Sequence, residues 1–219
     1  PLHLADRERD LWRLALDWAP TEPLSLQFAV ENATDLYPSS DFGPRNGKAQ
    51  NYSVDAAYTF SDKWQGTAWF SRNDTQIEQA TRCVSSTTSC GTVPQNWSAD
   101  LRNLGEAVGL GARSKPTGKL ELGADLQFSY DRGEYRLNAV MPSGVTPPPD
   151  THYQVTSLKL FGNYALKKNT GVGVKYTYER WSTDDWTWTN WTYGDGTRVN
   201  QDLVQRVHIV GIYGYYKWW

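Results

Sequence analysis

The residues of this sequence that could do chemistry are few. The densest group is WSTDDWTWTNWTYGDG at 181–196, where four tryptophans lie among acids and threonines. Such rings could stack on sugars or meet an extracellular protein, but we favour a loop that folds as a hairpin on a rim and packs its own aromatics. A calcium site built from Asp184, Asp185, Asp195 and Asp202 is disfavoured, because their spacing lacks the pattern of an EF-hand loop.

The cysteines and histidines give no catalytic pattern either. Cys83 and Cys90 bound the stretch CVSSTTSC, and a local disulfide across this loop is favoured over two free thiols. No CxxCH is present, so the chain attaches no c-type haem itself, and two cysteines alone cannot form a zinc site. His3, His152 and His208 are far apart, and no Ser-His-Asp arrangement or phosphate-binding glycine loop occurs. We therefore expect neither an enzyme nor a cofactor or metal held by this chain.

Composition narrows the class of protein. The 219 residues carry a formal net charge of -2, which gives no electrostatic case for nucleic acid. There are 11 Trp and 13 Tyr against 6 Phe, and residues with a polar tip on an apolar body favour binding faces or membrane interfaces. No apolar run is long enough for a transmembrane helix. The chain opens PLHLADRERD without Met, so we expect a fragment or a mature segment.

Period-two alternation is the dominant pattern, and it predicts β-strands. In 119–130, for example, Leu122 and Leu126 alternate with Glu121 and Asp125. Nine segments show this pattern: 10–18, 24–32, 51–60, 64–72, 106–113, 119–130, 157–166, 171–180 and 207–219.

The connections between these segments alternate in length. Short turns are expected at APTEP, SDK, SKPTG and KKNTG, and long polar loops at about 35–50, 73–100, 131–153 and 182–203. This alternation is typical of an antiparallel up-and-down meander with short turns at one rim and long loops at the other. A soluble sandwich usually mixes in Greek-key crossings.

We therefore expect an all-β transmembrane barrel, with the apolar face towards lipid and the polar face towards the lumen. Strand length and aromatic residues at strand ends support the barrel over a soluble sandwich. The expected interface aromatics are Trp12, Trp18, Trp64, Tyr130, Tyr216 and Trp218. The expected lumen-facing residues are Asp17, Glu31, Asp55, Asp125, Lys159, Lys175 and Glu179.

The closing stretch VHIVGIYGYYKWW at 207–219 resembles the C-terminal signal of bacterial outer-membrane barrels, except that Trp219 follows the penultimate aromatic. Two registers are open. The favoured lipid face is Val210, Ile212, Gly214, Tyr216 and Trp218. The alternative is Ile209, Gly211, Tyr213, Tyr215 and Trp219.

The C-terminal part also resembles one family in particular. A hairpin with a short basic turn, the stretch YERW at 178–181 leading into an Asp-Asp-Trp loop, and a last strand opening VHIVG cover roughly 155–218. These features are similar to the C-terminal part of the MtrB/PioB family of decahaem-associated outer-membrane barrels. The strands before about residue 155 share the general alternating pattern of the family but not these specific motifs.

The resemblance implies a location and partners. Family members are large barrels of the bacterial outer membrane that sheathe a periplasmic multihaem c-type cytochrome in the lumen, and electrons cross the membrane along its haems. The haem belongs to the partner, and an extracellular multihaem cytochrome is a possible further partner. Cys83 and Cys90 are not equated with the N-terminal cysteine motif of the family.

Family barrels are much longer than this chain, so we expect 1–219 to be a single transmembrane segment, the C-terminal part of a larger barrel with about nine strands visible. Two other functions are kept open. A general diffusion porin would keep a wet lumen with an inward-folded constriction loop. A soluble Trp-rich secreted β domain would bind carbohydrate.

Overall fold

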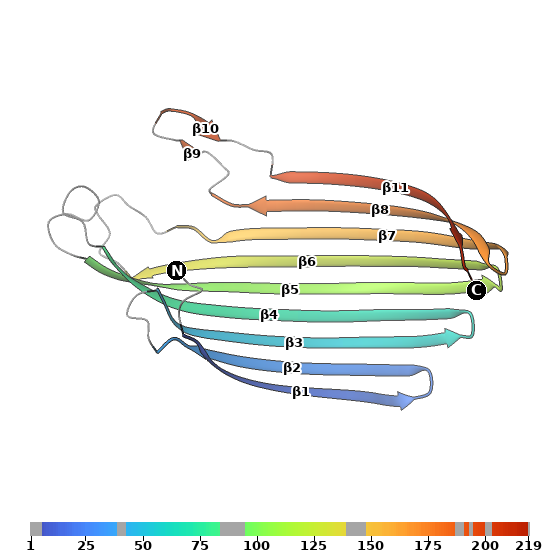
Figure 1. Ribbon diagram of the computed structural model, residues 1–219, viewed down its shortest axis with the longest axis horizontal. Coiled ribbons are helices and arrows are strands. Elements are labelled where there is room, and N and C mark those ends of the chain that lie inside the picture. The colour runs from blue at the N-terminus through green and yellow to red at the C-terminus, as the bar shows by residue number, and fades with distance from the viewer. Residues whose placement is uncertain are drawn as a thin grey trace.

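The computed structural model describes residues 6–38, 43–83, 95–138, 148–186, 191–192, 195–199 and 203–218. In these residues nine strands form one sheet in chain order, each antiparallel to its neighbours (Figure 1). They are β1 (Glu8–Thr21), β2 (Leu24–Leu36), β3 (Gly43–Ser61), β4 (Trp64–Cys83), β5 (Gln95–Thr117), β6 (Leu120–Asn138), β7 (Thr151–Lys167), β8 (Thr170–Asp184) and β11 (Val204–Tyr216). The strands β9 (Trp191–Thr192) and β10 (Arg198–Val199) pair separately. The expected all-β, up-and-down architecture is confirmed.

One rim of the sheet is made of tight turns. Two-residue turns join β1 to β2, β3 to β4, β5 to β6 and β7 to β8, and all four lie at the same end of the sheet (Figure 1). In two of them a hydroxyl at the end of the first strand accepts a backbone N–H of the turn: Ser61 Oγ from Lys63 and Thr117 Oγ1 from Lys119. The four short connections expected from the sequence are therefore present, and the other rim carries the longer connections.

Several strands are longer than the sequence predicted. The strand expected at 64–72 continues as β4 to Cys83, and the one expected at 106–113 begins as β5 at Gln95. Much of the expected loops at 73–100 and 131–153 is therefore strand, which corrects those boundaries. The apolar alternation ends before the strands do, because beyond it both faces are polar while the backbone ladder continues.

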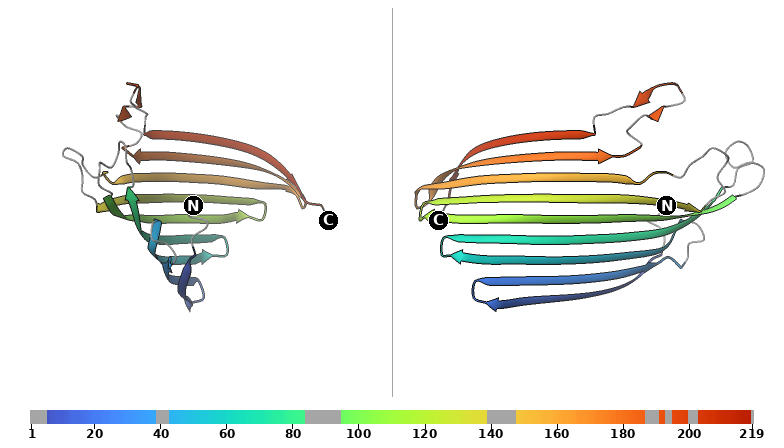
Figure 2. Two further views of the ribbon diagram at one scale, coloured as in Figure 1. Left: turned by 60° about the vertical axis from the view of Figure 1, so that its left-hand side comes forward. Right: turned by 180° about the vertical axis from the view of Figure 1, so that it is seen from behind.

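The sheet is a single layer. Both views in Figure 2 show one twisted, curved sheet with no second layer against either face. Among the described residues, the only buried hydrophobic side chains are Ala33 and Ala99, whereas Val210 and Ile212 are 68% and 79% exposed. A soluble sandwich would cover its apolar face with a second sheet. The described chain has no such cover, so the sandwich alternative is wrong. No helix of the described residues is long and apolar enough to cross a membrane.

Candidate functional site

The pairing register divides the side chains between two faces. Directly opposed residues of neighbouring strands share a face, and successive residues of a strand alternate. The row through Leu126 runs across the whole sheet: Trp18, Leu26, Ala56, Ala68, Leu110, Leu126, Leu158, Tyr178 and His208. We call the face of this row the apolar face and the other the polar face.

The apolar face carries an uncharged band next to the turn rim. Its side chains between Leu120 and Tyr130 on β6 are Leu, Ala, Phe and Tyr, with no Asp, Glu, Lys or Arg. The apolar face of the other eight strands also carries, near the turn rim, a run free of these four residue types. This run is shorter on some strands: it ends at Phe70 on β4, at Val108 on β5, at Tyr178 on β8 and at His208 on β11. On β6, ten residue steps of roughly 3.4 Å, tilted by about 45°, give a band roughly 24 Å tall, which matches the lipid-facing band of a transmembrane barrel.

Aromatic side chains mark both limits of this band. Trp12 and Tyr130 lie on the limit away from the turns, and Trp18, Trp64 and Tyr216 lie near the turn rim, all on the apolar face. The ring of Trp218, which follows β11, packs edge-on against Tyr216 with ring centroids 4.7 Å apart. The geometry suits two interface girdles, although a position at the membrane interface remains a prediction for these six residues.

The last strand takes the favoured register. Val210, Ile212, Gly214 and Tyr216 are paired with Tyr176, Val174, Val172 and Thr170 on β8, so they share the apolar face. Ile209, Gly211, Tyr213 and Tyr215 of the alternative register lie on the polar face instead. Tyr213, for example, donates its hydroxyl to Asn163 Oδ1 across β8.

All seven expected lumen residues lie on the polar face. Three have polar partners: Asp125 forms an ion pair with Arg113 at 2.8 Å, Glu31 accepts a hydrogen bond from Asn51 at 3.3 Å, and Glu179 accepts one from Ser157 at 3.5 Å. The other four form no ion pair or side-chain hydrogen bond within the described part of the chain: Asp17, Asp55, Lys159 and Lys175. That these seven side chains line a lumen is still a prediction.

Glycines on the polar face hold aromatic side chains of the neighbouring strands. A Cβ built on Gly109 would overlap the indole of Trp69, and one built on Gly123 would overlap the ring of Phe161. Gly173 holds Tyr213 in the same way. These rings therefore lie across the next strand. The protein's own rings thus occupy the open side of these glycines.

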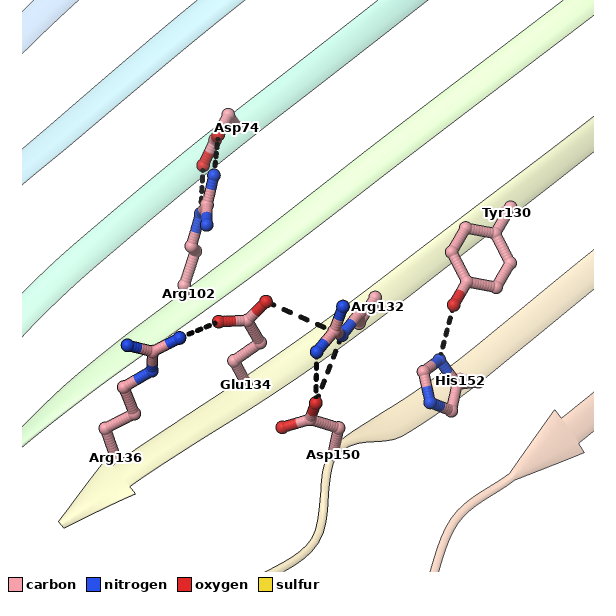
Figure 3. A network of polar contacts seen from close by, with 8 residues as sticks. All are labelled: Asp74, Arg102, Tyr130, Arg132, Glu134, Arg136, Asp150 and His152. Atoms are coloured by element: carbon pink, nitrogen blue, oxygen red, sulfur yellow. Dashed lines mark hydrogen bonds and ion pairs between the residues drawn. The ribbon is translucent and has the colours of Figure 1, made fainter.

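Beyond the band, the apolar face becomes charged (Figure 3). On β4 and β5, Arg72 pairs with Glu106 at 2.9 Å, and Arg102 forms a two-pronged contact with Asp74, with Nε donating to Oδ1 at 2.8 Å. The hydrogen bonds from Arg102 hold the pKa of Asp74 below its usual range. This end of the strands is thus held by cross-strand ion pairs rather than by apolar contacts.

The network continues from β6 towards the start of β7. Arg132 pairs with Asp150 at 2.6 Å and with Glu134 at 3.5 Å, and Glu134 also meets Arg136 at 3.1 Å (Figure 3). These pairs were not predicted from the sequence. The signal was the run of alternate Arg, Glu and Arg at 132–136, but only the observed register shows the apolar face carrying them.

The two histidines that the structure describes lie on the apolar face. His152 Nδ1 lies 2.6 Å from the Tyr130 hydroxyl and His208 Nδ1 lies 2.9 Å from that of Tyr176, so both histidines sit beside tyrosines. Among the described residues no group of three His, Cys, Asp or Glu could hold a metal. Cys90 and the side chain of Cys83 lie outside the described residues, so the disulfide stays a prediction.

The Trp-rich stretch is described only in part. β9 and β10 pair through Trp191 with Val199 and Thr192 with Arg198, which agrees with a small hairpin on the long-loop rim. In its turn, Asp195 Oδ1 accepts the backbone N–H of Thr197 at 2.9 Å, which lowers the pKa of that carboxyl. The packing of its tryptophans falls largely outside the described residues.

Solved structures with the same fold define the class. The ferric preacinetobactin receptor BauA of Acinetobacter baumannii matches with a TM-score of 0.65 at 12% identity, over 94% of this chain and 37% of the receptor. The copper transporter OprC matches with a TM-score of 0.65 at 11% identity, over 96% of this chain and 34% of the transporter. Both likenesses concern the fold alone, and they make this sheet an outer-membrane β-barrel fold.

The chain belongs to the family of putative outer membrane β-barrel porins MtrB/PioB, whose model matches residues 1–218. It is also 22% identical over 186 residues to the outer membrane protein MtrB of Shewanella baltica strain OS185. That alignment covers 84% of this chain and 25% of MtrB, so the chain spans about a quarter of the length of this relative. The expected family and the outer-membrane location are confirmed.

Proposed function

We propose that this chain forms part of the wall of a larger transmembrane barrel whose lumen holds a periplasmic multihaem c-type cytochrome. The barrel acts as a sheath, and electrons cross the outer membrane along the haems of the partner. The family membership supports a porin-like role in the outer membrane. Binding a cytochrome goes beyond that role. The observation that supports it is the arrangement of side chains on the polar face.

The polar face suits contact with a protein. Trp69 and Phe161 lie across glycines of the next strand, so their rings lie along the wall rather than project from it, and a partner can approach the polar face closely. Asp55 and Lys175 have no ion-pair partner in the described part of the chain. Unpaired charged side chains on the polar face can pair with opposite charges of a protein in the lumen, and such pairs fix the orientation of that protein.

The haem is supplied by the partner in this proposal. The sequence has no CxxCH motif, so a c-type haem would not be attached to this chain. Further strands are needed to close a barrel around a cytochrome, and the quarter-length match to MtrB leaves room for them. An extracellular multihaem cytochrome at the long-loop rim remains an expectation from the family resemblance.

The test is to purify the full-length, tagged protein from native outer membranes and record its visible spectrum and a haem-stained gel. A Soret band that belongs to a separate, co-eluting chain is the expected result. A colourless, heat-modifiable barrel that conducts ions across a planar bilayer would contradict the sheath and identify a diffusion porin.

A further inference from the structure

We propose that Arg180 and Arg206 bind phosphate groups of a lipid headgroup in the outer leaflet of the membrane. Arg180 on β8 and Arg206 on β11 are direct cross-strand partners. Both lie on the apolar face, because the neighbouring pair on that face, Tyr178 and His208, belongs to the row of Leu126. The two arginines are therefore the first charged row beyond the uncharged band on these strands.

The position of the pair selects the leaflet. It lies on the side of the band away from the two-residue turns, one of which joins β7 to β8 at Lys168 and Asn169 (Figure 1). Short turns of outer-membrane barrels are periplasmic and the longer loops are extracellular. A charged row at this limit of the apolar face therefore meets the headgroups of the outer leaflet.

The charge of this row is not balanced as it is on the neighbouring strands. In the next two rows away from the turns on the same face, Arg72 pairs with Glu106 at 2.9 Å, and Arg132 pairs with Asp150 at 2.6 Å. Arg180 and Arg206 form no ion pair within the described part of the chain. The other partner of Arg180, Thr156 on β7, is uncharged.

Two like charges opposed on neighbouring strands destabilise a sheet, and an anion between them removes that penalty. A guanidinium group presents a planar fork that matches phosphate oxygens, and two of them side by side suit a phosphorylated headgroup. Arg206 is exposed and Arg180 half-buried, so both can be reached from the membrane side. This site does not depend on what the lumen contains.

The test measures lipid retained by the full-length barrel after mild detergent extraction, with lipopolysaccharide phosphate as the readout. The double variant Arg180→Gln/Arg206→Gln should retain at least tenfold less lipid, because each lost charge-assisted contact costs on the order of a tenfold change in affinity. The matched control, Lys167→Gln/Lys168→Gln, removes the same charge from the exposed turn of the same hairpin and should retain lipid like the parent protein.

A titration of the delipidated barrel separates the possible anions. Phosphorylated lipid A should bind and raise the unfolding temperature of the parent protein but not of the arginine variant. Dephosphorylated lipid A and inorganic phosphate should have little effect. Equal lipid retention by the two double variants, or an equal response to inorganic phosphate, would overturn the proposal. Heat-modifiable migration of each variant shows that it is folded.

Discussion

At the scale of single residues, adjacent positions on a strand meet different surroundings. Leu126 lies in the uncharged band of the apolar face, whereas Gln127 lies on the polar face between Gly109 and Ser157. Side chains one position apart are therefore under opposite constraints, and the same substitution should have different costs at the two positions.

Leu126→Arg places a charge in the lipid-facing band and should lower the free energy of unfolding by roughly 2–4 kcal/mol if the position is near the midplane. Gln127→Arg should have a small effect, because its side chain points to the polar face. Urea unfolding of the full-length barrel in lipid vesicles measures both. Equal tolerance of arginine at the two positions would show that the faces are assigned wrongly.

The ion pairs beyond the band predict a pH dependence. The hydrogen bonds from Arg102 depress the pKa of Asp74. On the polar face, Arg9 donates to Asp35 at 2.6 Å and depresses the pKa of that carboxyl. A depressed carboxyl pKa stabilises the folded state above its unfolded value of about 3.9, and this stabilisation is lost as the pH falls through the folded pKa. The barrel should therefore unfold at lower urea below about pH 4 than at pH 7.

Asp74→Asn removes one of these carboxylates and should reduce the difference in urea midpoint between pH 7 and pH 3. The control is Asp62→Asn, because Asp62 lies in a turn and forms no ion pair in the described part of the chain. If both variants keep the full pH difference of the parent protein, the contact between Asp74 and Arg102 does not contribute to acid sensitivity.

At the scale of strands, the polar face depends on glycine positions that hold neighbouring rings. Gly109→Ala would push the indole of Trp69 off β5, and the overpacking should cost about 1–3 kcal/mol. Gly211→Ala is the matched control, because a Cβ there meets nothing within 4 Å. Thermal unfolding monitored by heat-modifiable migration compares them. A stable Gly109→Ala variant with unchanged Trp69 fluorescence would contradict the packing described.

Sequence periodicity predicts the strands well only in the parts that carry the lipid-facing band. In 119–130 one face must be apolar and the other need not be, so the alternation of Leu122 and Leu126 with Glu121 and Asp125 marks the strand. In the outer part of β5, from Gln95 to about Asn103, neither face is buried in lipid, and the alternation disappears although the ladder continues. Loops were therefore expected where strands extend.

The candidate site was likewise predictable only in part. The seven lumen-facing candidates share the polar face because alternation alone fixes the face of a residue. The contact between Arg102 and Asp74 depends on how β4 and β5 align, and this register is set by the whole ladder of backbone pairs rather than by either sequence. The ion-pair network and the unbalanced Arg180 and Arg206 therefore became visible only in the structure.

At the scale of the whole molecule, the sheet is a single layer whose two faces suit different surroundings. Its apolar face has an uncharged band bounded by aromatics, and its polar face has small residues, charges and rings lying across glycines. The two faces together explain why a chain with a polar average hydropathy folds without a core of its own. Both faces fit an outer-membrane β-barrel, which is the class that the family match and the solved structures indicate.

The most direct measurement of the sheath uses a photo-crosslinking amino acid at Gln127 or at Leu126 of the full-length protein in native outer membranes. The account predicts a haem-staining adduct from Gln127 and none from Leu126, because only the polar face meets the cytochrome. Haem-staining adducts from Leu126 alone, or from neither position in membranes that contain the cytochrome, would contradict it.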